Sequence, residues 1–184
     1  MKHLKLFESF EDIPSICKKY GIENYTINSD GSIDVEGNVD LSCKKLTKLP
    51  LKFKNVSGNF HCYDNQLTSL EGCPSSVGGY FHCTNNKLTS LEGCPSSVGG
   101  DFYCYSNRIT SLEGCPSSVG GGFYCHNNPI YNVWRLFQNY SKMEFFQDCD
   151  PIRDDKVIIL DRLNYFLETI GKPTVKKVEG YKCI

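Results

Sequence analysis

An internal repeat with a period of 21 residues constrains this sequence more than any other feature. The segment LTSLEGCPSSVGG occupies residues 67–79, recurs at 88–100 and returns as ITSLEGCPSSVGG at 109–121. The same phase continues in five aliphatic positions, so about five coils are encoded: Leu46, Leu67, Leu88, Ile109 and Ile130. Such a period is typical of a solenoid, in which each unit buries its apolar side only against its neighbours.

The octets beside these constant blocks hold three positions constant, namely a Phe, a Cys and an Asn. They read NFHCYDNQ from residue 59, YFHCTNNK from 80, DFYCYSNR from 101 and GFYCHNNP from 122. Because Phe and Cys are two residues apart, both point to the same side of a short strand, and we expect them to fill the core together. A buried Asn needs hydrogen-bond partners, and the backbone groups of the adjoining turn are the expected ones.

With the Leu or Ile that follows, each octet reads x-F-x-C-x-x-N-x-L. This resembles the leucine-rich repeat pattern L-x-x-L-x-L-x-x-N-x-L over about residues 38–130. The coil length and the Leu-x-x-Leu before a Pro also resemble short bacterial leucine-rich repeats, and the whole chain resembles the small leucine-rich repeat proteins of tailed bacteriophages. The resemblance implies an α/β solenoid with a parallel sheet. Gly78, Gly99 and Gly120 replace the first Leu of the pattern, and Lys44 replaces the Asn in the first coil.

The segments that flank the repeats are expected to cover their ends, because an open solenoid exposes its core and its strand edges. We therefore divide the chain into an N-terminal cap (1–37), the leucine-rich repeats (38–130) and a C-terminal helical cap (131–184). Local signals predict a capped helix, a hairpin and two further helices, over residues 12–21, 25–35, 128–143 and 155–171 respectively.

Composition and charge narrow the class of protein. The chain of 184 residues has 20 Lys and Arg against 21 Asp and Glu, and residues 58–130 carry two basic and five acidic side chains. This balance excludes the basic footprint of a duplex-binding protein. The 11 cysteines are an odd number and no signal-peptide run precedes them, so we expect reduced, mostly buried thiols in a cytoplasmic protein. No run of about 18 apolar residues is present, so we expect no membrane association.

The positions that vary between repeats lie beside Phe and Cys, and the two-residue period of a strand turns them outward. They carry rings and one carboxylate: His61, Tyr63, Tyr80, His82, Asp101, Tyr103, Tyr105, Tyr124 and His126. Tyr and His offer rigid, amphipathic contact area at low entropy cost, as in antibody paratopes. These nine residues are therefore the predicted partner-binding site.

Other interpretations of the same face remain open. The rings are good strand formers and could simply pack on each other between coils. They could also stack the bases of a single-stranded nucleic acid, with Lys87 and Arg108 meeting phosphates. A metal held by His61 and His82 needs at least one more ligand, for which His126 lies two coils away from His82, and the cysteines lack the paired C-x-x-C spacing of a zinc site. Thiol catalysis is disfavoured, because the alternation sends imidazole outward and sulfur inward.

The sequence therefore favours a non-enzymatic binding module that uses no cofactor and holds no metal. The resemblance to tailed-phage proteins implies that its partner is a host or viral protein in the cytoplasm of the infected cell, with a host-defence factor as one candidate. Nucleic acid is the less favoured partner. The sequence does not separate binding of another protein from self-association.

Overall fold

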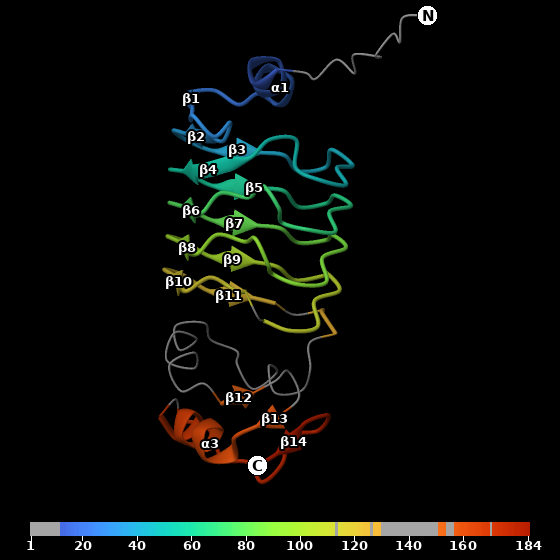
Figure 1. Cartoon of the computed structure of the whole chain (residues 1–184), viewed down its shortest axis with the longest axis vertical. Coiled ribbons are helices and arrows are strands. Elements are labelled where there is room, and N and C mark those ends of the chain that lie inside the picture. Colours follow the sequence, from blue (N-terminus) through green and yellow to red (C-terminus); the bar gives the residue numbers. More distant parts are fainter. Residues whose placement is uncertain (1–11, 113, 126, 130–150, 154–156, 170) are drawn as a thin grey trace, which may run out of the picture.

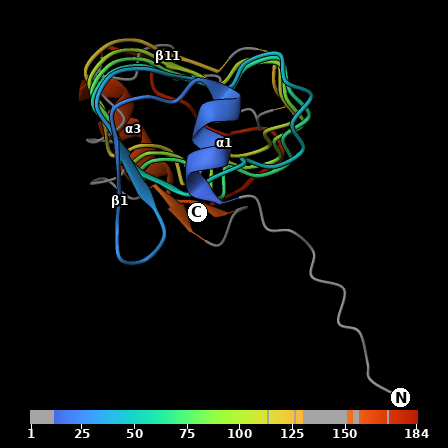
Figure 2. The same ribbon diagram turned by 90° about the horizontal axis from the view of Figure 1, so that it is seen from above.

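The computed structural model describes residues 12–112, 114–125, 127–129, 151–153, 157–169 and 171–184 (Figure 1). Most of the helix predicted over 128–143, the predicted start of a helix at Asp155, and His126 lie outside these residues. Within them, each coil of the repeat has two short strands. The coils follow one another along the solenoid in the order of the sequence (Figure 1). Seen along the solenoid axis, they lie on top of one another (Figure 2).

Two sheets run along the solenoid, and their strands pair in parallel except for β1 and β2. Sheet A has the strand order β1-β2-β4-β6-β8-β10, and sheet B has the order β11-β9-β7-β5-β3. The strands of sheet A are β1 (Tyr25–Ile27), β2 (Ile33–Val35), β4 (Phe53–Val56), β6 (Ser76–Val77), β8 (Ser97–Val98) and β10 (Ser118–Val119). The strands of sheet B are β3 (Val39–Asp40), β5 (Phe60–His61), β7 (Phe81–His82), β9 (Phe102–Tyr103) and β11 (Phe123–Tyr124).

The predicted solenoid and its parallel sheet are confirmed, but the predicted α/β architecture is not observed in the coils. Where an α/β solenoid has helices, the described residues of the repeats form the strands of sheet A. The Ser-Ser-Val-Gly-Gly segment explains this difference. Its Val points inward and is buried in β6 and β8, whereas its small residues let successive coils approach closely.

The glycines at the first Leu position of the pattern are required by this close approach. A Cβ atom added to Gly99 would lie 2.1 Å from the carbonyl oxygen of Gly78, and one added to Gly78 would lie 2.1 Å from that of Ser57. Because both obstacles are backbone atoms, neither can move without separating the coils. The departure from the leucine-rich repeat pattern is thus the feature that permits the second sheet.

The core is a stack of equivalent side chains from successive coils. Phe60 pairs in register with Phe81, and Phe81 with Phe102. Their rings stack with centroids 5.6 and 5.2 Å apart, and all three are fully buried. Cys62, Cys83 and Cys104 form a second buried column beside them. The inward orientation predicted for Phe and Cys is confirmed, and the ten described cysteines are all free thiols.

A buried Asn in each of three successive coils ties the turn after the sheet B strand to the preceding coil. The Asn86 side-chain amide donates to the carbonyl oxygens of Cys62, Cys83 and Thr84, and its oxygen accepts from the backbone N–H of Leu67. Asn65 and Asn107 repeat this pattern with three carbonyl oxygens each. The predicted satisfaction of the Asn by backbone groups is confirmed, and each Asn links two coils.

The N-terminal elements agree with the local signals. Helix α1 (Ile13–Tyr20) begins after Asp12, whose carboxylate accepts from the Ser15 N–H, and ends at Gly21 in the left-handed conformation. Strands β1 and β2 form the predicted hairpin. Strand β1 is antiparallel to β2 and occupies the outer edge of sheet A, so the first coil does not present a bare parallel strand.

The C-terminal elements differ from the predicted helical cap. Helix α3 (Leu160–Thr169) lies inside the predicted 155–171 segment and buries Leu163, Phe166 and Leu167. A three-stranded sheet was not predicted: it consists of β12 (Ile152–Arg153), β13 (Val157–Ile158) and β14 (Lys182–Cys183). Strand β13 pairs in parallel with β14 from the far side of α3, and local sequence patterns do not reveal such a pairing. No helix in the described ranges is long and apolar enough to cross a membrane.

Replacing the buried Asn86 tests the link between coils. Asn86→Asp removes the amide donor and sets a carboxylate against three carbonyl oxygens, so we expect the free energy of unfolding to fall by about 3 kcal/mol. Denaturant titration of the variant measures this. The control is Asn85→Ser, an exposed position where the next coil has Ser106, and it should change stability by less than about 1 kcal/mol. Equal effects of the two substitutions would contradict the assignment.

Replacing Gly99 tests the close approach of the coils. Gly99→Ala forces a methyl group against the Gly78 carbonyl oxygen, and we expect a loss of about 2–3 kcal/mol. Ser97→Ala, in the same segment but with an exposed side chain, should stay within about 0.5 kcal/mol of the parent. Thermal unfolding of both variants provides the comparison. An unchanged melting temperature for Gly99→Ala would show that the coils are not in contact at this point.

Candidate functional site

Sheet B presents its variable residues on its outer surface, opposite the Phe and Cys columns. Four of them are in register across adjacent strands, so that His61 pairs with His82, His82 with Tyr103, and Tyr103 with Tyr124. We call the outward residues of this sheet the aromatic strip. Its described members are His61, Tyr63, Tyr80, His82, Asp101, Tyr103, Tyr105 and Tyr124. The ninth predicted member, His126, lies outside the described residues.

The rings of the strip touch one another along the whole described length. Tyr63 and His82 have centroids 4.5 Å apart, His82 and Tyr103 lie 5.0 Å apart, and Tyr103 stacks on Tyr124 at 4.8 Å. This is the packing between coils that the alternative interpretation predicted. Two rings nevertheless remain in solvent, since Tyr80 is 46% exposed and Tyr124 is 43% exposed. The strip is therefore a continuous half-buried surface with two exposed tyrosines.

The N-terminal half of the strip is built on histidines. His82 Nε2 lies 2.8 Å from Thr84 Oγ1, and its ring packs edge-on against His61 at 5.9 Å. Burial, together with the neighbouring His61, lowers the pKa of His82 despite the opposing influence of Asp64. His61 Nδ1 is buried and has no hydrogen-bond partner in the described part of the chain. The lowered pKa of His82 favours the neutral form of that ring near pH 7.

The C-terminal half of the strip is built on tyrosines around one carboxylate. The Tyr103 hydroxyl donates to Asp101 Oδ2 at 2.6 Å, and the Gly122 N–H donates to Asp101 Oδ1 at 2.7 Å. The hydrogen bond to Asp101 raises the pKa of Tyr103 to about 12, and the same hydrogen bond lowers the pKa of Asp101. At neutral pH the site therefore holds the charged carboxylate of Asp101 next to the neutral phenol of Tyr103.

The thiols do not contribute to this surface. Cys62, Cys83 and Cys104 lie on the inner side of sheet B, and burial raises the pKa of each thiol well above its ordinary value. A thiol and the imidazole next to it in sequence consequently face opposite sides of the sheet. Among the residues that the structure describes, no group of three or more His, Cys, Asp or Glu side chains is placed to hold a metal ion.

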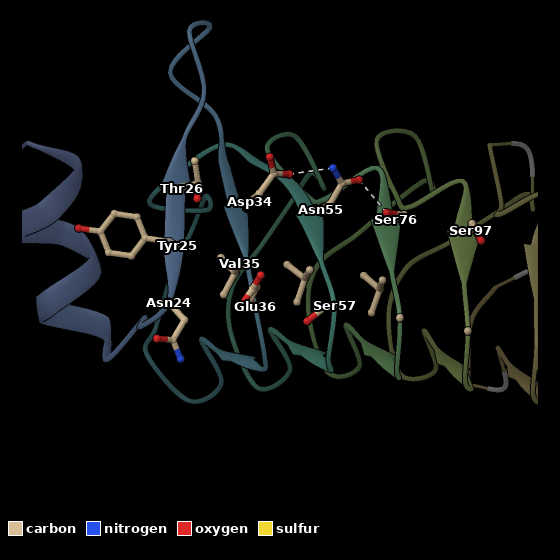
Figure 3. Close-up of a pocket in the computed structure, with 14 residues that line it drawn as sticks. Asn24, Tyr25, Thr26, Asp34, Val35, Glu36, Asn55, Ser57, Ser76 and Ser97 are labelled. Atoms are coloured by element: carbon tan, nitrogen blue, oxygen red, sulfur yellow. Dashed lines mark hydrogen bonds between the residues drawn. The ribbon is translucent and has the colours of Figure 1, made fainter.

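Sequence reasoning missed a shallow polar groove on sheet A, beside the β1–β2 hairpin (Figure 3). The Asn55 amide donates to Asp34 Oδ1 at 2.7 Å, and the Ser76 hydroxyl donates to Asn55 Oδ1 at 2.7 Å. Ser97 continues this row along the groove. The 21-residue spacing of Asp34, Asn55, Ser76 and Ser97 is visible in the sequence. Local patterns predict a strand only at Asp34, within the 25–35 hairpin, and not at the other three residues.

The lowered pKa of His82 makes stability depend on pH. Because the unfolded chain binds a proton at His82 more readily than the folded chain does, acidification favours unfolding. The effect begins near the ordinary pKa of about 6.5 and grows until the pH reaches the lower pKa of the folded state. We expect the melting temperature to fall between pH 7.5 and 5.5, and to fall less in His82→Tyr, which has the residue found at position 103. An identical fall in both proteins would contradict this.

No protein-family model, curated protein or solved structure matches this chain. The functional assignment therefore rests on the geometry of the aromatic strip and on the chemistry of its side chains.

Proposed function

We propose that this chain is a non-enzymatic binding module of the leucine-rich repeat type, and that the aromatic strip engages a protein partner. The observation that carries the proposal is the contrast between the two sides of sheet B. The inner side repeats the same Phe and Cys in the four coils from residue 59 onward, whereas the outer side differs from coil to coil. A chain that served only as a scaffold would need the packing residues of the inner side, but it would not need rings on the outer side.

The chemistry of the strip favours a protein as the partner. Tyrosine rings combine apolar area with a hydroxyl group and lose little entropy on binding, and they are enriched where proteins meet. Tyr80 and Tyr124 remain nearly half exposed, whereas every other described ring of the strip is more deeply buried. Burial of these two rings by a partner would contribute most of the hydrophobic gain, as expected for the central anchors of an interface.

The same chemistry argues against single-stranded nucleic acid, the second candidate. Asp40, Asp64 and Asp101 are carboxylates on or beside the outer face of sheet B, and they would repel a phosphate backbone. Lys87 lies at the turn after the strand, where its ammonium group donates to Gln66 at 3.1 Å. An electrostatic groove along the rings, which nucleic-acid binding of this kind uses, is therefore lacking among the described residues.

Removing the two exposed rings tests the proposal. We expect the double variant Tyr80→Asn, Tyr124→Ser to lose capture of its partner from host lysate by about tenfold or more, since anchor tyrosines contribute strongly to binding. Quantitative mass spectrometry of the captured proteins measures the loss. Asn at position 80 is the residue that the chain already has at 38 and 59, so the fold should persist, and circular dichroism checks this.

The matched control alters the opposite sheet. Ser76→Ala with Ser97→Ala should leave the capture unchanged, because both side chains lie on sheet A. Capture that survives in the strip variant, or that disappears equally in the control, would overturn the proposal. Binding of labelled oligonucleotides that weakens steeply with salt would instead favour the nucleic-acid candidate.

A further inference from the structure

Position 101 carries a charge that the fold does not need. Just before three of the sheet B strands, a side-chain oxygen accepts the backbone N–H of the equivalent residue one coil later. Asn38 accepts from Asn59, Asn59 accepts from Tyr80, and Asp101 accepts from Gly122, at 2.8, 2.8 and 2.7 Å. A neutral amide therefore performs this function in two coils. The hydrogen bond between coils therefore does not require the negative charge of Asp101, and another role must account for that charge.

The Asp101 carboxylate has acceptor positions to spare and, among the described residues, no ion pair. Its two oxygens offer about four acceptor positions, of which the Gly122 N–H and the Tyr103 hydroxyl take one each. In the described ranges no ion pair joins Asp101 to a lysine or an arginine. The side chain is half-buried at the surface of the strip. Two neutral donors thus hold it in place, and no lysine or arginine of the described ranges compensates its charge.

Aromatic rings stand on either side of this carboxylate. Tyr103 stacks on Tyr124 with a centroid distance of 4.8 Å and meets Tyr80 edge to face at 6.4 Å. The rings of Tyr80 and Tyr124 lie across Gly100 and Gly122, where any Cβ atom would collide with them. Both rings are nearly half exposed. Ring faces beside an anchored carboxylate form the environment that attracts a cation, because the ring quadrupole and the charge act together.

Building on the proposed function, we infer that the partner inserts an arginine side chain here, with its guanidinium group contacting Asp101, Tyr80 and Tyr124. A guanidinium group fits better than an ammonium group, because it is planar, can stack on a ring and can donate two hydrogen bonds to one carboxylate. The acidic balance of residues 58–130, with two basic and five acidic side chains, favours the approach of a basic segment.

The test uses the intact, isotopically labelled chain and three short peptides as probes. The peptides are acetyl-Gly-Arg-Gly-amide, its lysine analogue and its citrulline analogue, which has the shape of arginine without the charge. Nuclear magnetic resonance titration follows the backbone signals of Asp101, Tyr103, Gly122 and Tyr124. We expect saturable shifts with arginine, an affinity about fivefold or more above that of citrulline, and a smaller gain for lysine.

Two isosteric variants separate the specific charge from general electrostatics. Asp101→Asn keeps the acceptor for the Gly122 N–H and should abolish the preference for arginine over citrulline. Asp64→Asn removes the same charge at an exposed site where the next coil has Asn85, and it should keep the preference. The inference is overturned if arginine and citrulline shift the signals equally, if no peptide shifts them, or if Asp101→Asn keeps the preference. If one of these results is obtained but the variant without the two rings still loses its partner, the proposed function is retained and only the arginine contact is rejected.

Discussion

Hydrogen bonds between successive coils are the constraint on which this structure depends. The strands of each coil are short and pair with strands of the neighbouring coils. The backbone N–H and C=O groups of a coil therefore form hydrogen bonds mainly with the coil before it and the coil after it. The buried asparagines reinforce this at the turn, where Asn65, Asn86 and Asn107 each donate to carbonyl groups of two coils. An insertion or deletion within one coil would misalign these bonds, and this explains why the period stays at 21 residues across the constant blocks.

The interior follows from the same constraint. Because identical positions stack on one another, each must hold a side chain that packs against its own copy. Flat Phe rings do so at about the spacing of the strands, with centroids 5.0–5.6 Å apart. Cysteine fills the smaller space beside them without requiring a disulfide. On the other sheet, Val and Gly take the place of Leu, since Gly78 and Gly99 lie against backbone carbonyl groups and leave no room for a side chain.

A scaffold specified in this way leaves the outer surface free to change, and the changes are concentrated on sheet B. Its histidines share a half-buried region in which burial lowers the pKa of His82. Its tyrosines surround Asp101, whose charge exceeds what the backbone requires, because Asn59 accepts the same kind of hydrogen bond without it. Exposed rings and a fixed carboxylate lie close together, and this proximity makes the C-terminal half of the strip the strongest candidate for recognition.

The sequence alone determined the solenoid, its period, the inward columns of Phe and Cys, the backbone partners of the buried Asn and the outward direction of the strip. These features depend on periodicity, which is visible in one chain, and on the alternation of side chains along a strand. Only the tertiary structure decided that the Ser-Ser-Val segment forms a second sheet, that β14 pairs with β13, and that Tyr103 donates to Asp101 while Tyr80 and Tyr124 stay exposed. These features depend on the distance between coils and on how each ring settles against its neighbours, and neither is encoded in local patterns.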